Sequence, residues 1–206
     1  MNGSREETPA WVESQRKWLR STVVGRLGIY PPWCAPVGNV PVSIDPGSTF
    51  GHGAHPSTAL VLAEVDRLTG PTTSVLDVGC GSGVLGIAAA RLGAQPVVSI
   101  DVEANAVERT RANAAANGVE LSVSTTPIDN LAGSFDLVLA NVLPVVHRAI
   151  AIAVSQHVAS TLVVSGILDE QTEEVCTNYF ATGLIEDRRT SVDGWTAIVL
   201  SRPHED

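Results

Sequence analysis

A glycine-rich stretch, VLDVGCGSGVLG at residues 75–86, constrains the fold of this chain more than any other part of its sequence. It begins with an apolar, strand-like run and leads into a run of helix-forming residues, GIAAARL. A glycine loop between a buried strand and a helix is typical of the first turn of a parallel α/β sheet, where the backbone comes close to a ligand. The stretch therefore predicts an α/β fold with a cofactor at this turn.

Strand and helix patterns alternate along the rest of the chain, which indicates a parallel sheet covered by helices on both faces. The expected strands lie near residues 74–78, 96–102, 121–124, 135–140 and 160–165, and the expected helices near 57–68, 83–92, 103–117, 143–159 and 169–181. Two further strand-like runs, 184–192 and 195–201, flank the tight-turn dipeptide Asp193-Gly194. We predict a Rossmann-like, doubly wound α/β sheet that is mostly parallel and ends in an antiparallel hairpin.

The segment ahead of this alternation has a different composition. Residues 9–27 carry Trp11, Trp18 and other apolar side chains at helical spacing, so we expect a short amphipathic helix there. The residues that follow are dense in proline and glycine and predict an ordered loop. We therefore divide the chain into residues 1–41, an N-terminal helix and lid segment, and residues 42–206, the Rossmann-like domain.

The charge and the cysteine content of the chain limit the classes of partner and site that we expect. The 206 residues include 13 lysines and arginines against 22 aspartates and glutamates, a net charge of −9. This balance disfavours a nucleic-acid partner and suits a basic protein or an amine substrate. Three cysteines at unrelated spacings indicate neither a disulfide framework nor a zinc site, and no stretch predicts a signal peptide or a membrane span. We expect a cytoplasmic protein, and its oligomeric state stays open.

The glycine stretch contains two cofactor patterns. From Gly81 it matches the G-x-G-x-x-G of a dinucleotide site, and from Asp77 it matches the acidic-G-x-G-x-G of S-adenosylmethionine (AdoMet) methyltransferases. A carboxylate is a poor neighbour for a pyrophosphate but a favourable one for a sulfonium and an amino group. Asp77 therefore favours AdoMet, and Gly83 and Gly86 are left to pack the helix on the sheet. An NAD(P)-dependent oxidoreductase stays the alternative.

Asp101 lies at the end of the second expected strand and is placed to accept hydrogen bonds from two ribose hydroxyls under either interpretation. Its alternative role is to cap the helix that starts near Glu103. Cys80, within the glycine loop, has no local histidine partner, so packing is favoured over nucleophilic catalysis.

The remaining histidines and one tryptophan are given structural roles. His52 and His55 lie three residues apart without an acidic or cysteine partner at ligand spacing, so no metal is expected. His147 and His157 fall on one expected helix and are placed at the surface or half-buried. Trp195 is expected to pack on the hairpin rather than to stack on a substrate, and an aromatic wall of the acceptor pocket is its alternative role.

Several stretches together resemble the PrmA-type ribosomal-protein lysine methyltransferases, which modify a stalk protein of the large subunit. The matching stretches are DPGSTFGHGAHPSTAL (45–60), VLDVGCGSGVLGIAAARLGA (75–94), SIDVEANAVERTRANAAANGV (99–119), LVLANVLP (137–144) and SGILDEQ (165–171). The first of these joined to A-N-V-L is far more specific than the glycine motif alone. The resemblance implies a class I AdoMet-dependent methyltransferase that transfers a methyl group to an amine.

The resemblance also implies site residues. AdoMet contacts fall on Thr58, Gly79, Asp101 and Asn141, and the glycine motif adds Asp77 and Gly81 to the cofactor-binding set. Phe50 is placed to pack over the cofactor, or else to anchor the glycine-rich loop around it. These residues form the candidate cofactor site.

Thr58 and Asn141 each have a chemical role available. The Thr58 hydroxyl and the free N–H groups of a helix start can hold the methionine carboxylate, with a plain helix-start role as the alternative. The amide oxygen of Asn141 can accept a hydrogen bond from an incoming amine, which makes it the candidate catalytic residue; a strand-end turn is its alternative.

The sequence constrains the identity of the methyl acceptor less than it constrains the type of reaction. His52 and Ala54 stand where the family usually has threonines, and we expect no room before residue 42 for the ferredoxin-like recruiting domain that the family carries. A protein lysine, an N-terminal amine and a small-molecule amine therefore all stay open as acceptors. A non-catalytic AdoMet-binding scaffold is the further alternative.

Overall fold

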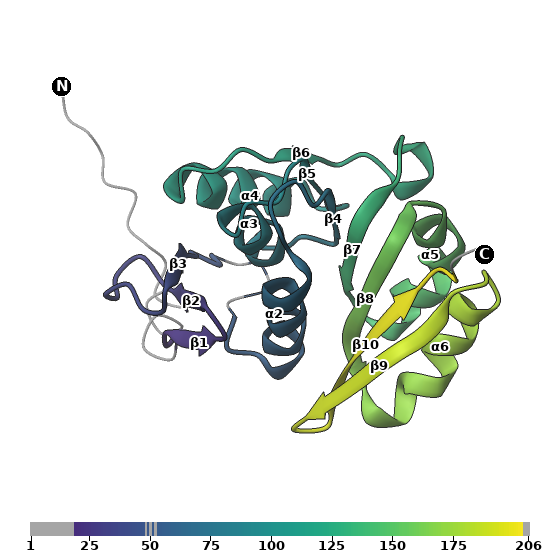
Figure 1. Cartoon of the computed structure of the whole chain (residues 1–206). Coiled ribbons are helices and arrows are strands. Elements are labelled where there is room, and N and C mark those ends of the chain that lie inside the picture. Colours follow the sequence, from purple (N-terminus) through teal and green to yellow (C-terminus); the bar gives the residue numbers. More distant parts are fainter. Residues whose placement is uncertain (1–18, 48, 50, 52, 204–206) are drawn as a thin grey trace.

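A seven-stranded sheet forms the centre of the chain in the computed structural model, which describes residues 19–47, 49, 51 and 53–203 (Figure 1). The strand order is β6-β5-β4-β7-β8-β10-β9. The strands are β4 (Val75–Val78), β5 (Val97–Ile100), β6 (Ser122–Ser124), β7 (Phe135–Asn141), β8 (Val158–Leu168), β9 (Ile185–Val192) and β10 (Trp195–Ser201). The five strands from β6 to β8 pair in parallel, whereas β10 is antiparallel to both β8 and β9. The predicted doubly wound sheet with its closing hairpin is confirmed.

Helices cover both faces of this sheet. They are α2 (Pro56–Leu68), α3 (Val84–Arg91), α4 (Ala104–Ala116), α5 (Pro144–Gln156) and α6 (Thr172–Phe180), with short 3-10 turns η1 (Ile128–Asn130) and η2 (Asp169–Gln171). Successive residues of β4 point to opposite faces, so Val75 joins a core with α2 and α3 while Leu76 joins a core with α5 and α6. Within the described ranges, no helix combines the length and the apolar content needed to cross a bilayer.

A second, three-stranded sheet lies ahead of α2 and was not predicted. It consists of β1 (Thr22–Val24), β2 (Leu27–Tyr30) and β3 (Val40–Ser43), paired in that order. The predicted helix over residues 9–27 is wrong for residues 19–27, and its earlier part lies outside the described residues. Gly25, with φ +56°, starts a two-residue turn that pairs Val24 with Leu27 across a hairpin.

Two asparagines one helical turn apart on α4 hold the segment that leads from β3 toward the site. The Asn117 side chain accepts from Ser43 N (2.8 Å) and donates to Ser43 O (2.7 Å). The Asn113 side chain does the same at Asp45, accepting from N (3.1 Å) and donating to O (3.0 Å). Each amide thus satisfies both backbone groups of one residue, Ser43 at the end of β3 and Asp45 just beyond it, which fixes the segment where its strand pairing ends.

Candidate functional site

A cavity of about 620 Å³ opens at the carboxyl ends of the parallel strands. Its walls come from the glycine loop after β4, the residues after β5 and β7, and the beginnings of α2 and β10. The predicted site residues that line it are Thr58, Gly79, Gly81, Asp101 and Asn141. They are far apart in the sequence and are brought together because parallel strands end at one edge of the sheet.

Backbone hydrogen bonds fix the loop between β4 and α3. Gly79 N and Cys80 N both donate to the carbonyl of Ile100, at 2.9 and 3.0 Å. Gly79 has φ +74°, and a Cβ on it would lie 2.5 Å from Val142 Cγ1, so this position requires glycine. The loop therefore presents backbone, not side chains, to this end of the cavity.

Asp101 supports this loop and lines the cavity beside it. Gly81 N donates to its Oδ2 at 2.9 Å, and Glu103 N donates to its Oδ1 at 3.0 Å. The bond from Glu103 N closes a short turn just ahead of α4, whose N-cap is Glu103 and not Asp101, so Asp101 supports the glycine loop without capping the helix. Each carboxylate oxygen keeps a second lone pair, so Asp101 is also able to accept a ribose hydroxyl. The ribose contact itself stays a prediction.

Asn141 and Thr58 are neighbours in the wall of the cavity. Thr58 is fully buried in the first turn of α2, and Asn141 Nδ2 lies 3.4 Å from its Oγ1. Asn141 Oδ1 is buried and has no hydrogen-bond partner among the described residues. A buried acceptor without a partner costs about 1–3 kcal/mol, so a ligand that donates to this oxygen would gain that amount.

Asp77 does not line the cavity. It is 0% exposed beneath the glycine loop, where its Oδ2 accepts from Gly86 N at 3.1 Å and its Oδ1 has no partner among the described residues. Burial raises the pKa of this carboxyl from 3.8 to about 7, against the lowering effect of the Gly86 N–H. Direct contact between Asp77 and a cofactor stays a prediction, and the placement supports an action through the loop or through its field.

Cys80 is a packing residue, as predicted. It is 6% exposed and accepts a hydrogen bond from Thr110 Oγ1 at 3.3 Å. Burial, followed by the charge of Asp77, raises the pKa of the thiol to about 12, so it carries no thiolate at neutral pH. Phe50 and His52 lie outside the described residues. In the part of the chain that the structure describes, no three His, Cys, Asp or Glu side chains gather as a metal site.

The prediction that His147 and His157 are exposed or half-buried is wrong. His147 is 0% exposed: its Nε2 donates to Ser165 O and its Nδ1 accepts from the Tyr179 hydroxyl, both at 2.8 Å. Burial lowers its pKa to about 4, so the ring is neutral and braces the end of β8 behind the cavity. His157 is 6% exposed and contacts the carbonyl of Gly133.

Two rings that the sequence did not place at the site belong to its wall. Trp195 and His55 both line the cavity, and their rings meet edge to face with centroids 4.6 Å apart. This position supports the alternative in which Trp195 forms an aromatic wall of the acceptor pocket, and stacking on a substrate stays untested. The signal for the position of Trp195 was its place as the first residue of an antiparallel strand, since such a strand begins at the edge where the parallel strands end.

A family model described as ribosomal protein L11 methyltransferase (PrmA) matches residues 3–203 of this chain. The ribosomal protein L11 methyltransferase of Symbiobacterium thermophilum is 38% identical over 208 residues, which cover 96% of this chain and 67% of that protein. Its counterpart in Dechloromonas aromatica is 43% identical over 176 residues, which cover 82% and 58%. This chain therefore spans about two thirds or less of the length of these relatives.

Solved structures give a consistent picture. The ribosomal protein L11 methylase of Lactobacillus delbrueckii subsp. bulgaricus superimposes with a TM-score of 0.80 at 28% identity, covering 89% of this chain and 97% of that one. The N-methyltransferase NodS of Bradyrhizobium japonicum in complex with S-adenosyl-L-homocysteine has a TM-score of 0.57 at 19% identity, covering 73% and 90%. The second likeness concerns the fold alone.

Proposed function

This chain belongs to the ribosomal protein L11 methyltransferase (PrmA) family, and we propose from that premise that it transfers a methyl group from AdoMet to a lysine amine of a ribosomal protein. One observation carries the proposal: Asn141 Oδ1, a buried acceptor without a partner among the described residues, lies in the same cavity as the glycine loop and Asp101. This arrangement supports a hydrogen bond from a bound amine to Asn141 beside a loop suited to a cofactor. Residues 42–206 are the proposed catalytic unit, and a ribosomal substrate would put the reaction in the cytoplasm.

The described residues fit AdoMet in charge and shape. Gly79 and Gly81 leave room for the methionine part, Thr58 offers a hydroxyl at a helix start, and Asp101 offers a carboxylate to the ribose. Apolar side chains after β5 and β6, among them Val102 and Ile128, form a surface for the adenine. When bound, AdoMet supplies a methyl group whose bond to sulfur breaks, with the electron pair left on sulfur, as the amine nitrogen bonds to the carbon.

The work of this chain is to hold the amine neutral and aligned. An amine N–H that donates to Asn141 Oδ1 leaves the nitrogen lone pair free to point toward the methyl group. A mainly apolar wall disfavours the ammonium form, which lowers the pKa of a bound lysine from its usual value near 10.4. Positioning and desolvation supply the catalysis in this proposal, without a dedicated base.

Labelled AdoMet tests the proposal directly. Purified protein is incubated with AdoMet carrying a deuterated methyl group and with bacterial ribosomal protein L11, and the products are analysed by mass spectrometry. We expect label on lysine of the ribosomal protein, and much less of it with Asn141→Ala. Label only on free small amines would support the small-molecule alternative. Binding of AdoMet without transfer to any amine or protein would support the scaffold alternative.

The dinucleotide alternative is disfavoured by the family and not by the glycine pattern. The G-x-G-x-x-G match depends on Gly86, which lies in α3 against the sheet: a Cβ on it would be 2.7 Å from Ser99 Oγ and 3.2 Å from Asp77 Oδ2. Gly86 therefore serves helix packing and does not line the cavity, which is also the role of the third glycine in a dinucleotide motif. The family, and not Gly86, favours AdoMet over NAD(P).

A further inference from the structure

Trp195 marks one end of the cavity. The strand order places β10 beyond β8, while Asp101 follows β5 on the other side of β4 and β7. Asn141, at the end of β7, lies between these two ends. If Asp101 holds the ribose, the Trp195–His55 wall is at the end where the amine enters.

The backbone pairing near Trp195 is short. β10 pairs with β8 at Trp195 and Thr196, but the register shifts before Ile198. Ser165 and Gly166 of β8 both lie opposite the intervening residue, and Gly166 has φ +83°, as expected of a bulge. The hairpin tip, in which Trp195 stays paired with Val192 of β9, is therefore offset from the regular ladder with β8, so other contacts help to fix it against β8.

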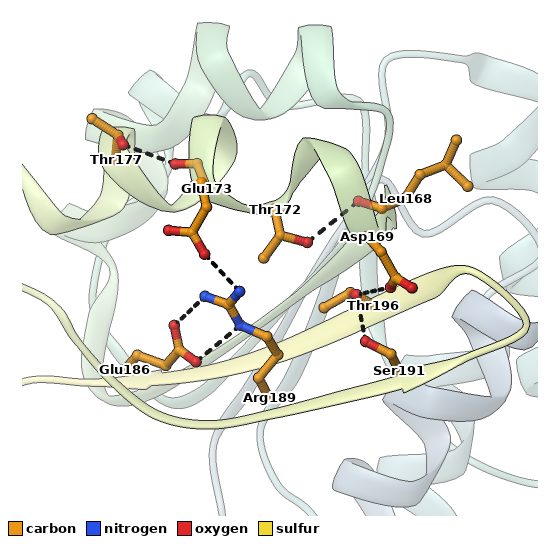
Figure 2. A network of polar contacts seen from close by, with 9 residues as sticks. All are labelled: Leu168, Asp169, Thr172, Glu173, Thr177, Glu186, Arg189, Ser191 and Thr196. Atoms are coloured by element: carbon orange, nitrogen blue, oxygen red, sulfur yellow. Dashed lines mark hydrogen bonds and ion pairs between the residues drawn. The ribbon is translucent and has the colours of Figure 1, made fainter.

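Asp169 supplies contacts on both sides of Trp195. Its backbone N–H donates to the carbonyl of Gly194, at 3.1 Å. Its Oδ1 accepts from Thr196 Oγ1, at 2.5 Å (Figure 2). Thr196 is 1% exposed, and its Oγ1 also lies 2.8 Å from Ser191 Oγ on the paired strand. One residue thus holds the neighbour before Trp195 and the neighbour after it.

Asp169 is itself fixed in place. It begins η2, where Leu168 N donates to Gln171 Oε1 at 2.9 Å. Thr172 Oγ1 donates to Leu168 O at 3.3 Å (Figure 2). These bonds set the direction in which the chain leaves β8. The carboxylate of Asp169 is therefore presented to the hairpin from a rigid turn.

We propose that Asp169 is a positioning residue that acts through Trp195 to hold the amine-entry end of the cavity. The proposal rests on the proposed function, because it takes the Trp195 wall as the acceptor side. Asp169 touches neither substrate nor cofactor. Its loss should impair methyl transfer and leave cofactor binding intact, since the glycine loop and Asp101 lie at the opposite end.

The test compares Asp169→Ala and Thr196→Val with a matched control on the same hairpin, Asp187→Ala. Asp187 accepts from Ser201 Oγ at 2.9 Å, far along the strands from the tip. We expect the first two variants to lower kcat/KM for methylation of bacterial ribosomal protein L11 about 10-fold or more, a loss typical of misplaced substrate. Affinity for S-adenosylhomocysteine should stay within about 2-fold, and Asp187→Ala should match the wild type. A larger loss of cofactor affinity than of kcat/KM would overturn the proposal.

Two further measurements separate positioning from general destabilisation. Asp169→Asn keeps an oxygen that can accept from Thr196, so it should restore most of the activity. In a Trp195→Ala background, Asp169→Ala should cause no further loss, whereas multiplied losses would overturn the proposal.

A spectroscopic measurement makes the test independent of the substrate. The indole N–H resonance of Trp195, assigned by its disappearance in Trp195→Phe, should shift in Asp169→Ala and not in Asp187→Ala. An unshifted resonance would refute the proposal. If the wild type does not methylate the ribosomal protein, the proposed function fails, and the indole resonance still decides whether Asp169 positions Trp195.

Discussion

Replacement of Asp77 by asparagine should make the protein more stable than the wild type at pH 8, with little difference at pH 4. Asp77 is 0% exposed, and burial raises its pKa from 3.8 to about 7. Asparagine keeps an oxygen for the Gly86 N–H and resembles the protonated acid in shape. The variant thus removes the cost of a buried charge while it preserves the hydrogen bond.

The sign and size follow from proton linkage. Between pH 3.8 and about 7 the folded protein holds a proton on Asp77 that the unfolded chain has released. The free energy of unfolding therefore falls as the pH rises through this window and levels off above it. Each pKa unit corresponds to about 1.36 kcal/mol, so the full shift is worth on the order of 4 kcal/mol. The advantage of Asp77→Asn should grow by that amount between pH 4 and pH 8.

Urea denaturation followed by circular dichroism measures this difference across the pH range. Asp136→Asn is a control of opposite sign, because hydrogen bonds from the Ser74 hydroxyl and N–H lower the pKa of Asp136. Removal of the Asp136 charge should lower the free energy of unfolding at pH 7, and this difference from the wild type should vanish as the pH falls through the pKa of Asp136. A difference between Asp77→Asn and the wild type that does not change with pH would refute the reasoning.

Three substitutions at the cavity give further expected outcomes. Asp101→Ala should raise the dissociation constant for AdoMet about 10- to 150-fold in calorimetric titration, since a charged hydrogen bond is worth about 1.5–3 kcal/mol, and an unchanged constant would contradict ribose contact. Asn141→Ala should lower the single-turnover rate more than cofactor affinity, and the opposite pattern would assign Asn141 to the cofactor alone. Gly166→Ala should lower the free energy of unfolding by about 1–3 kcal/mol, because φ is +83° and the new Cβ would lie 2.4 Å from Val142 O; an unchanged urea midpoint would contradict this.

The central sheet was predictable because its strands carry strong local signals. Short apolar runs that end at a glycine, such as Val75–Val78, indicate a buried strand from the local sequence alone. The small sheet was missed because proline and glycine obscure short strands: Pro41 lies within β3, where pairing with β2 on one side only leaves its missing N–H harmless. Gly25, which follows two valines and stands two residues before a leucine, was a signal for the hairpin of β1 and β2. The helical spacing of the nearby tryptophans favoured a helix instead.

The site residues that lie at the ends of strands could be predicted from the sequence. Asp101 directly follows β5 and Asn141 is the last residue of β7, so their place at one edge follows from the topology. Asp77 shows the limit of such reasoning, because the side chain before a loop can point beneath it as readily as toward the ligand. Burial of His147 depends on a tyrosine and a carbonyl from other elements, although its alignment with Ala151 and Val154 on one helix face was a signal.

The position of β2 and β3 against α2 limits how this chain can be shortened or recombined. Leu27, Ile29 and Val42 belong to the same core as Val61 and Leu62, and all five are at most 1% exposed. A version trimmed to residue 42 would uncover this apolar surface and invite aggregation. Chimaeras that exchange the N-terminal part of the protein should therefore be joined ahead of Thr22, so that the small sheet and α2 come from the same parent protein.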